Sequence, residues 1–263
     1  LFAELLSFRL ERLAPERVPV LRERASLWFA REGQLSEALA QAAHLEDPTL
    51  LVRLLDRHGY RVLARSEFSA FAHWLERVDD PAAWRWPLFL VAVTWYQVQV
   101  DRRADLERWL TLLDAAIADP PAGYPDDLLE EARLHRAVIR AFWLRVHGRM
   151  AEALASAREV LERVPPHDPV LRGMTEFQIA AIGLRLGDMR AARDDLVRAC
   201  GTTRAGGAAY IFLASLGHLG AVLAQTEGVP VARRHFSEAI AQAEARRTDR
   251  LPAFGIILYQ AAD

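Results

Sequence analysis

Apolar residues recur at helical spacing along most of the chain, and a turn residue interrupts them at intervals. The stretch WFAREGQLSEALAQAAHLEDP, residues 28–48, is typical. An apolar helical end meets Gly33, a small residue follows at Ala38, and a second apolar run ends before Pro48. Because Gly takes positive φ at low cost, it can end one helix and let the chain reverse. The pattern predicts a hairpin of two helices.

The same arrangement recurs along the sequence, with a turn residue followed about five residues later by an expected buried position. The pairs are Gly33 and Ala38, Ser66 and Phe71, Asp101 and Leu106, Gly148 and Ala153, Gly187 and Ala192, and, one residue shorter, Gly228 and Ala232. Successive turn residues are 33, 35, 47, 39 and 41 positions apart. Spacings of this size are typical of helical repeats, and no convincing period-two strand is present. We therefore expect an all-α fold, a right-handed superhelix (α-solenoid) of about six to seven tetratricopeptide-like hairpins.

Prolines fall between the predicted hairpins, where the loss of a backbone donor is tolerated. Two segments rich in turn residues, ADPPAGYPDD at 118–127 and CGTTRAGGA at 200–208, are predicted to be flexible joints.

Composition narrows the classes of function. The 33 basic residues are all Arg, so chemistry that needs Lys is excluded in this chain, and the net charge of −2 with interspersed signs predicts no direct contact with nucleic acid. A single Cys excludes an intrachain disulfide and a zinc cage of cysteines. No apolar run reaches the roughly 18 residues of a membrane span, and no signal peptide is visible. We expect a cytoplasmic protein without membrane contact.

Motifs for catalysis and metal binding are missing. The eight His residues are scattered without an HExxH pattern, and no GxSxG or Cys/His arrangement occurs. Acidic doublets such as Glu130-Glu131 lie near predicted helix starts or on polar faces, where a carboxylate meets the helix dipole favourably. We therefore expect no catalytic residue, no metal site and no cofactor in this chain, and we predict that it is not an enzyme.

The first 78 residues carry a more specific resemblance. The segments LFAELL, LRERASLWF, GQLSEAL, LLDRHGYRVLARSE and WLERV resemble the region after the ATPase module in MalT-like regulators. These are LuxR-family, ATP-dependent transcriptional activators of the STAND class. The rest of the chain resembles tetratricopeptide repeats only as generic helical hairpins.

The resemblance implies a division of the chain. Residues 1–15 would be the tail of a winged-helix arm and residues 16–263 the tetratricopeptide-type sensor domain. Because GxxxxGK[ST] and a basic C-terminal recognition helix do not occur, ATP binding and DNA contact would lie in other modules of a longer protein. The start at Leu1 and the late apolar run LPAFGIILYQ also suggest a fragment. Oligomerisation would go through the full-length protein.

A binding groove is the candidate site. In tetratricopeptide-like hairpins the first helix lines the concave face, and counting back from each turn residue places seven side chains there: Trp95, Phe142, Arg145, Phe177, Arg185, His218 and Gln225. Aromatic faces beside Arg, His and Gln would suit a polar organic ligand such as a sugar, or a peptide. The alternative is that the aromatic residues are core and the polar groups are solvated, since a shift of one or two residues in register turns a side chain out of the groove.

These observations give a functional hypothesis with two alternatives. The chain would bind a small-molecule inducer or a protein partner in its groove and pass the signal to the ATPase and DNA-binding modules. A stand-alone tetratricopeptide-type interaction scaffold would have the same pattern. So would a regulatory repeat domain of an enzyme.

Overall fold

The computed structural model describes residues 9–10, 12–78, 81–100, 105–245, 255 and 257. Over these residues it has helices and no strand, which confirms the all-α prediction. The α-helices are α2 (Val18–Arg31), α3 (Leu35–Ala42), α4 (Thr49–Ala64), α5 (Phe68–Leu75), α6 (Pro87–Gln99), α7 (Leu106–Ala118), α8 (Asp126–Val146), α9 (Met150–Arg163), α10 (Pro169–Leu186), α11 (Met189–Gly206), α12 (Ala209–Thr226) and α13 (Val229–Ala245). Two short 3-10 helices, η1 (Pro15–Arg17) and η2 (Pro81–Arg85), precede α2 and α6.

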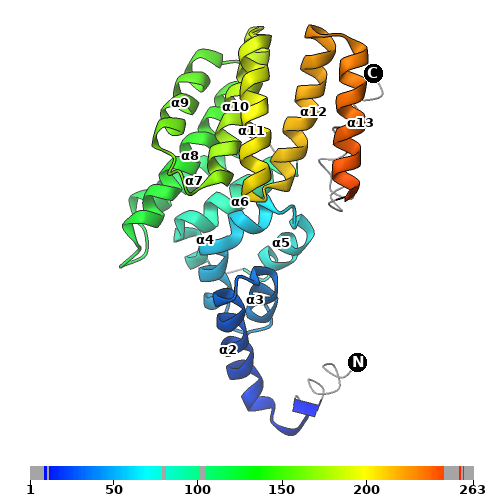
Figure 1. The fold of residues 1–263 in the computed structure, drawn as a ribbon. Helices are drawn as coiled ribbons and strands as arrows, with labels where there is room; N and C mark the ends of the chain where they lie inside the picture. The colour runs from blue at the N-terminus through cyan, green and yellow to red at the C-terminus, as the bar shows by residue number, and fades with distance from the viewer. Residues whose placement is uncertain are drawn as a thin grey trace.

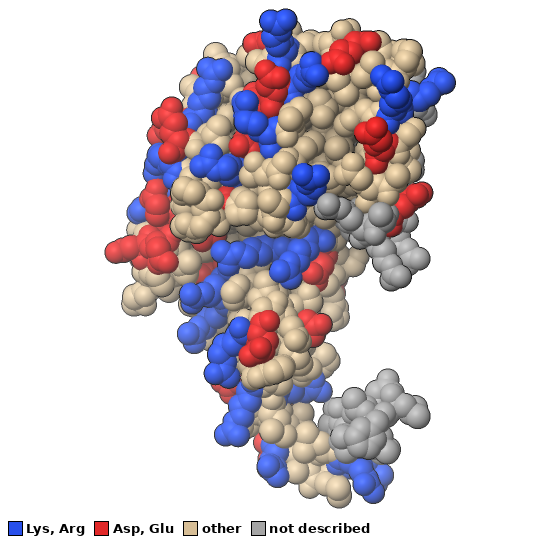
Figure 2. Space-filling view, viewed as in Figure 1, with Lys and Arg blue, Asp and Glu red and all other residues tan. Residues whose placement is uncertain are grey.

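Consecutive helices pair into hairpins that stack along the chain, so the described residues form an α-solenoid of six hairpins, as predicted. In Figure 1, α2 and α3 form the narrow lower end, and the helices from α7 to α13 stand beside one another in the wider upper part. Figure 2 shows acidic and basic side chains intermixed over the upper part and a larger share of Arg on the narrow lower part.

Four of the six predicted turns share one backbone geometry, whereas at Gly228, with φ 95°, the glycine itself donates its N–H to Leu223. Gly33, Ser66, Gly148 and Gly187 have φ values of 75°, 68°, 78° and 82°. At each of them the following residue donates its N–H to a carbonyl five positions back, as in the 3.0 Å bond from Asp188 to Gly183. This is the Schellman motif, which satisfies carbonyls that a helix end leaves unpaired. Asp101 lies outside the described residues.

The positions predicted to be buried after each turn are buried. Ala38, Phe71, Leu106, Ala153, Ala192 and Ala232 are all at most 4% exposed. Small side chains at four of these positions let the second helix of a hairpin lie close to the first.

One of the two predicted joints is wrong. Residues 119–125 do form a loop between α7 and α8, but α11 runs on through residues 200–206. Thr203 is fully buried against Gly173, where an added Cβ would lie 2.4 Å from the Thr203 methyl carbon. Gly206 approaches Pro169 in the same way. The small residues here serve close packing of α11 on α10, and the helix ends only at Gly207, with φ 71°.

The solenoid is wound more tightly than a chain of nearest-neighbour repeats. The Tyr60 ring on α4 meets His135 on α8 at 4.1 Å between centroids, and its hydroxyl lies 3.9 Å from the Met174 sulfur on α10. Phe68 on α5 meets Tyr210 on α12 at 5.6 Å. In an ordinary solenoid each repeat contacts only its neighbours. Here α4 reaches three hairpins further along and α5 reaches four, and one large core joins them.

Helix α12 is the one helix of the described part that is long and apolar enough to cross a membrane by length and composition. Of its apolar window, 61% is buried inside the structure. Its Gly220 lies against the Phe236 ring of α13, so α12 has the packing of a core helix.

Candidate ligand-binding pocket

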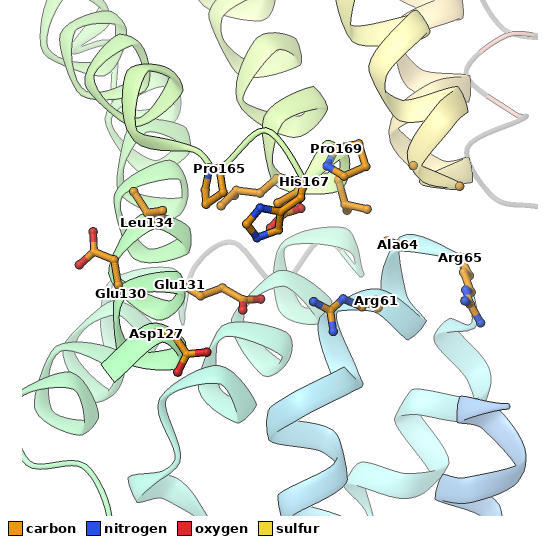
Figure 3. A pocket seen from close by; sticks show the side chains of 15 residues that line it. Arg61, Ala64, Arg65, Asp127, Glu130, Glu131, Leu134, Pro165, His167 and Pro169 are labelled. Carbon is orange, nitrogen blue, oxygen red and sulfur yellow. The ribbon is translucent and has the colours of Figure 1, made fainter. Parts of the chain in front are cut away.

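A cavity of about 470 Å³ lies where four segments that are far apart in the sequence meet (Figure 3). They are the end of α4, the first turns of α8, the segment 165–171 that leads into α10, and the turn between α11 and α12. The winding of the solenoid creates this junction, because it brings α4 against α8 and α10. Volumes of about 300–1,000 Å³ are usual for small-molecule sites.

Local chemistry fixes the side chains around the cavity. Asp168 is the N-cap of α10, and its carboxylate accepts the N–H of Leu171 at 3.0 Å, with Pro169 at the first helical position. Such a cap satisfies one of the free donors at a helix start. On α8, Glu131 and His135 are four residues apart, so they lie on the same face of the helix.

Charges of both signs line the cavity. In Figure 3, Arg61 from α4 and Glu131 from α8 point toward one another across the space. Neither side chain makes a hydrogen bond or an ion pair within 4 Å to another described residue. Glu130 turns outward and pairs with Arg163 and Arg133 instead. The cavity therefore presents an unpaired cation, Arg61, and an unpaired anion, Glu131, on opposite walls, and Arg65 and Asp127 add a further charge of each sign to its lining.

Behind this wall lies a buried polar cluster. Side-chain atoms of Glu131, His135 and Asp168 lie within 4.8 Å of one another, and His135 is fully buried. The indole N–H of Trp95 donates to Nδ1 of His135 at 3.3 Å. The other ring nitrogen, Nε2, has no hydrogen-bond partner among the described residues.

The contact with Trp95 defines the tautomer of His135. An indole N–H can only donate, so Nδ1 must accept, and the proton of the neutral ring sits on Nε2. Burial lowers the pKa of His135 to about 4, so the ring is neutral near pH 7. A metal ion would need the lone pair of Nε2, with a hydrogen-bond acceptor facing Nδ1. The described arrangement is the reverse, and the cluster does not fit a metal ion.

The acidic side of the cavity is short of positive charge. Burial is the main cause that raises the pKa of Glu131 above its ordinary value, and the nearby carboxylates of Asp168, Asp56 and Asp127 raise it further. Arg61 acts in the opposite direction. A cationic group placed beside Glu131 would therefore be stabilised.

Four of the seven predicted groove residues come together elsewhere, on helices α8, α10 and α12. The Arg145 guanidinium lies 4.9 Å from the Phe142 ring centroid and donates to the Gln178 amide oxygen at 3.3 Å. The Phe177 ring meets His218 at 5.2 Å, edge to face. Burial, with a contribution from the positive charge of Arg145, lowers the pKa of His218. We call Phe142, Arg145, Phe177 and His218 the predicted surface.

The other three predicted residues do not join this surface. Trp95 is 2% exposed and bonded to His135, because α6 is apolar on all sides and is packed between α4, α7 and α8. Its groove assignment is replaced by a core position. Arg185 and Gln225 are exposed near the ends of α10 and α12. Phe142 is only 7% exposed, so within the predicted surface it is mainly core packing.

The cavity was not predicted from the sequence. Glu131 was visible only as half of an acidic doublet, and His135 as one of eight scattered His residues. The spacing of four residues between them was a usable signal, because it places two side chains on one helix face. Asp168 and Arg61 gave no such signal, since each lies more than 30 residues from Glu131 and only the winding of the solenoid brings them together.

Comparisons with known proteins give one relationship. No protein-family model matches the chain. Over 177 residues, 66% of its length, it is 30% identical to the serine/threonine-protein kinase PknK of Mycobacterium tuberculosis, and equally to PknK of Mycobacterium bovis. The matched part spans 16% of the kinase's length. The chain is thus similar to a minor portion of a much longer signalling protein.

Proposed function

We propose that this chain is the sensing domain of a MalT-like, LuxR-family ATP-dependent transcriptional regulator, and that it senses by binding a small molecule in the cavity between α4, α8 and α10. The cavity is the observation that carries the proposal. Its walls come from four segments that the winding brings together, and unpaired charges face into it. The similarity to a small part of a long kinase supports a regulatory role within a larger protein.

The position of the cavity suggests how binding would be transmitted. A ligand that touches Arg61 on α4 and Glu131 on α8 would connect the early hairpins to the later ones. Ligand binding favours whichever winding of the solenoid it contacts better, and it shifts the population only by that difference in affinity. Because small rotations between repeats add along a solenoid, a change at this junction would move the ends of the chain.

The chemistry that follows sensing would take place outside this chain. ATP hydrolysis and DNA binding would belong to other modules of the full-length protein, which would act in the cytoplasm and oligomerise when activated. This chain would contribute neither catalytic residues nor a cofactor.

A second candidate function is protein–protein interaction on the predicted surface. Arg145 over an aromatic ring and the Phe177–His218 pair offer an aromatic and cationic patch, a composition that is common at interface hot spots. This surface would suit a scaffold that holds a peptide or partner protein.

Two measurements test the sensing function. The first is the sequence of the whole gene, where we expect a P-loop module before this region and a helix-turn-helix module after it. The second is a reporter assay on the full-length protein with Val170→Trp, which places a large side chain at the cavity wall. We expect the response to inducer to be lost while basal expression is kept.

The control is Val197→Trp, at a position that is 52% exposed on α11 and away from the cavity. It should leave the response unchanged. The proposal would be refuted by a gene that does not encode both the P-loop module and the helix-turn-helix module. It would also be refuted by a response to inducer that persists in the Val170→Trp protein.

A further inference from the structure

We propose that the cavity binds a small zwitterion, either an amino acid with an apolar side chain or a dipeptide of such residues. The inference deepens the proposed sensing function by naming the class of ligand for the same site. It rests on three features: opposed charges across the cavity, an unpartnered buried donor behind its acidic wall, and an apolar wall.

The opposed charges carry the most weight. Arg61 and Glu131 point toward one another (Figure 3), and no ion pair joins them in the described part of the chain. Glu131 is partly buried whereas Arg61 is exposed, and a partly buried charge is unfavourable unless it is paired. A zwitterion placed between them would pair its carboxylate with Arg61 and its ammonium with Glu131 and Asp168. It would do so without adding net charge to the site.

The unpartnered donor is His135. Trp95 holds the ring so that Nε2 carries the proton, and this N–H is fully buried next to the Glu131 and Asp168 carboxylates. Leaving a buried donor unpaired is costly. His135 does not itself line the cavity. A zwitterion that extends past the Glu131 side chain would bring an oxygen that accepts from Nε2, together with an ammonium for the neighbouring carboxylates.

The remaining walls are apolar. Ala64, Leu134, Pro165 and Val170 line the cavity beside the charged groups. An aliphatic side chain would be buried against them, while the polar end of the ligand lies among Arg61, Glu131 and Asp168. The volume of about 470 Å³ leaves room for more than one side chain, which is why a dipeptide is included.

Other ligand classes fit less well. A metal ion conflicts with the tautomer of His135. A simple amine would satisfy Glu131 but leave Arg61 facing an additional cation. A simple carboxylate would satisfy Arg61 but approach the Glu131 and Asp168 carboxylates without an ammonium between them.

The test is isothermal titration of the 263-residue chain at pH 7 with matched probes. L-leucine and L-leucyl-L-leucine are the aliphatic zwitterions, isopentylamine lacks the carboxylate, and isocaproate lacks the ammonium. L-phenylalanine is an aromatic zwitterion, and glucose and zinc chloride complete the set. We expect a zwitterion to bind at least about tenfold more tightly than either half-molecule, the ratio expected from one additional charged hydrogen bond.

Conservative variants locate the binding. Arg61→Gln and Glu131→Gln should each weaken zwitterion binding by about tenfold or more, because each removes one charged partner. Arg53→Gln on the exposed face of α4 and Glu162→Gln on the exposed face of α9 are the matched controls and should bind normally. Trp95→Phe should change the tautomer of His135, which nitrogen NMR of the ring reports independently of binding. Circular dichroism checks that every variant is folded.

The outcomes separate this inference from the proposed function. Three results would each overturn the zwitterion as the ligand class. The first is binding of isopentylamine or isocaproate as tight as that of leucine, and the second is no saturable heat from either aliphatic zwitterion or from phenylalanine even at about 10 mM. The third is normal zwitterion binding by both Arg61→Gln and Glu131→Gln. If glucose binds instead and Val170→Trp abolishes its effect in the full-length reporter, the ligand class is wrong and sensing stands. If leucine binds at Arg61 and Glu131 but no reporter output changes, the ligand class stands and sensing fails.

Discussion

The starts of α6 and α11 are capped by the same chemistry over very different distances along the chain. At α11, the Asp188 carboxylate accepts the N–H of Ala191, three residues away, at 3.1 Å. At α6, the Asp56 carboxylate of α4 accepts the N–H of Phe89, 33 residues away, at 2.9 Å. Asp56 also accepts from the Tyr124 hydroxyl, and it is only 4% exposed, whereas Asp188 is exposed. One cap is local and solvated, and the other holds three segments together in the core.

This difference extends to the two halves of the molecule. In the distal half, α10 to α13, caps and turn residues next to each helix define the structure. In the proximal half, α4 to α8, the buried side chains of Asp56 and His135 hydrogen-bond to residues from other hairpins, although Nε2 of His135 has no partner among the described residues. The cavity lies where the proximal half meets α10. Local chemistry therefore builds the repeats, and contacts between repeats build the candidate site.

Removing the long-range cap should have the largest effect on stability. Asp56→Ala leaves the Phe89 N–H and the Tyr124 hydroxyl without their acceptor, and each unsatisfied buried group costs about 1–3 kcal/mol. We expect a loss of about 3 kcal/mol in the free energy of unfolding, measured by urea denaturation. Asp188→Ala is the matched change and should lose about 1 kcal/mol, as is usual for an exposed N-cap. Equal losses of unfolding free energy in the two variants would show that the two caps contribute equally to stability, and this would contradict the difference described above.

The distal half also has close contacts between neighbouring helices, and the tightest of them is at Gly220 on α12. A Cβ there would lie 2.3 Å from the Phe236 ring of α13. Gly220→Ala should therefore destabilise the protein by about 2 kcal/mol through overpacking. Gly201→Ala, at an exposed position within α11 where an added Cβ meets nothing within 4 Å, should instead gain up to about 1 kcal/mol of helix propensity. Thermal unfolding of both variants checks the pair, and a stable Gly220→Ala protein would mean that α13 can move away.

Acidification changes the contributions to stability of the buried acid and of the buried histidines of the proximal half in opposite directions. Burial raises the pKa of Asp56 to about 6, so this group contributes stability at low pH that is lost as pH rises toward 6. Burial lowers the pKa of His135 and of His58 to about 4, so both contribute stability at neutral pH that is lost as pH falls from about 6.5 toward 4. The two effects oppose one another over the same range.

The variant Asp56→Asn keeps an acceptor but removes the titration. Between pH 6.5 and 4.5 we expect it to lose about 2 kcal/mol more stability than the parent protein, since it lacks the compensating gain from protonated Asp56. Urea denaturation at the two pH values measures the difference. Parallel pH profiles of the parent and the variant would show that Asp56 does not titrate in this window.

The sequence predicts the repeats well for the same reason that it misses the site. A helical hairpin is encoded by residues within about one period, so Gly33, Gly148 and Gly187 identified their turns and the buried positions five residues later. The contact between Trp95 and His135 spans 40 residues, and the register of α6 could not be read because the helix is apolar on all sides. The error at residues 200–206 has a related cause, since glycine marks both turns and close helix contacts.

The smallest expected effect concerns Ser66, which has the left-handed backbone conformation, φ 68°, that Gly has at the equivalent turns. This conformation costs a residue with a side chain about 1–2 kcal/mol, and the Ser66 hydroxyl is buried without a partner among the described residues. Ser66→Gly should therefore gain about 1 kcal/mol, while Gly187→Ala should lose about the same amount. Thermal unfolding compares the two. A loss of stability in Ser66→Gly would mean that the hydroxyl has a partner, and that even the most regular element of the repeat, its turn, depends in the proximal half on a contact from elsewhere in the chain.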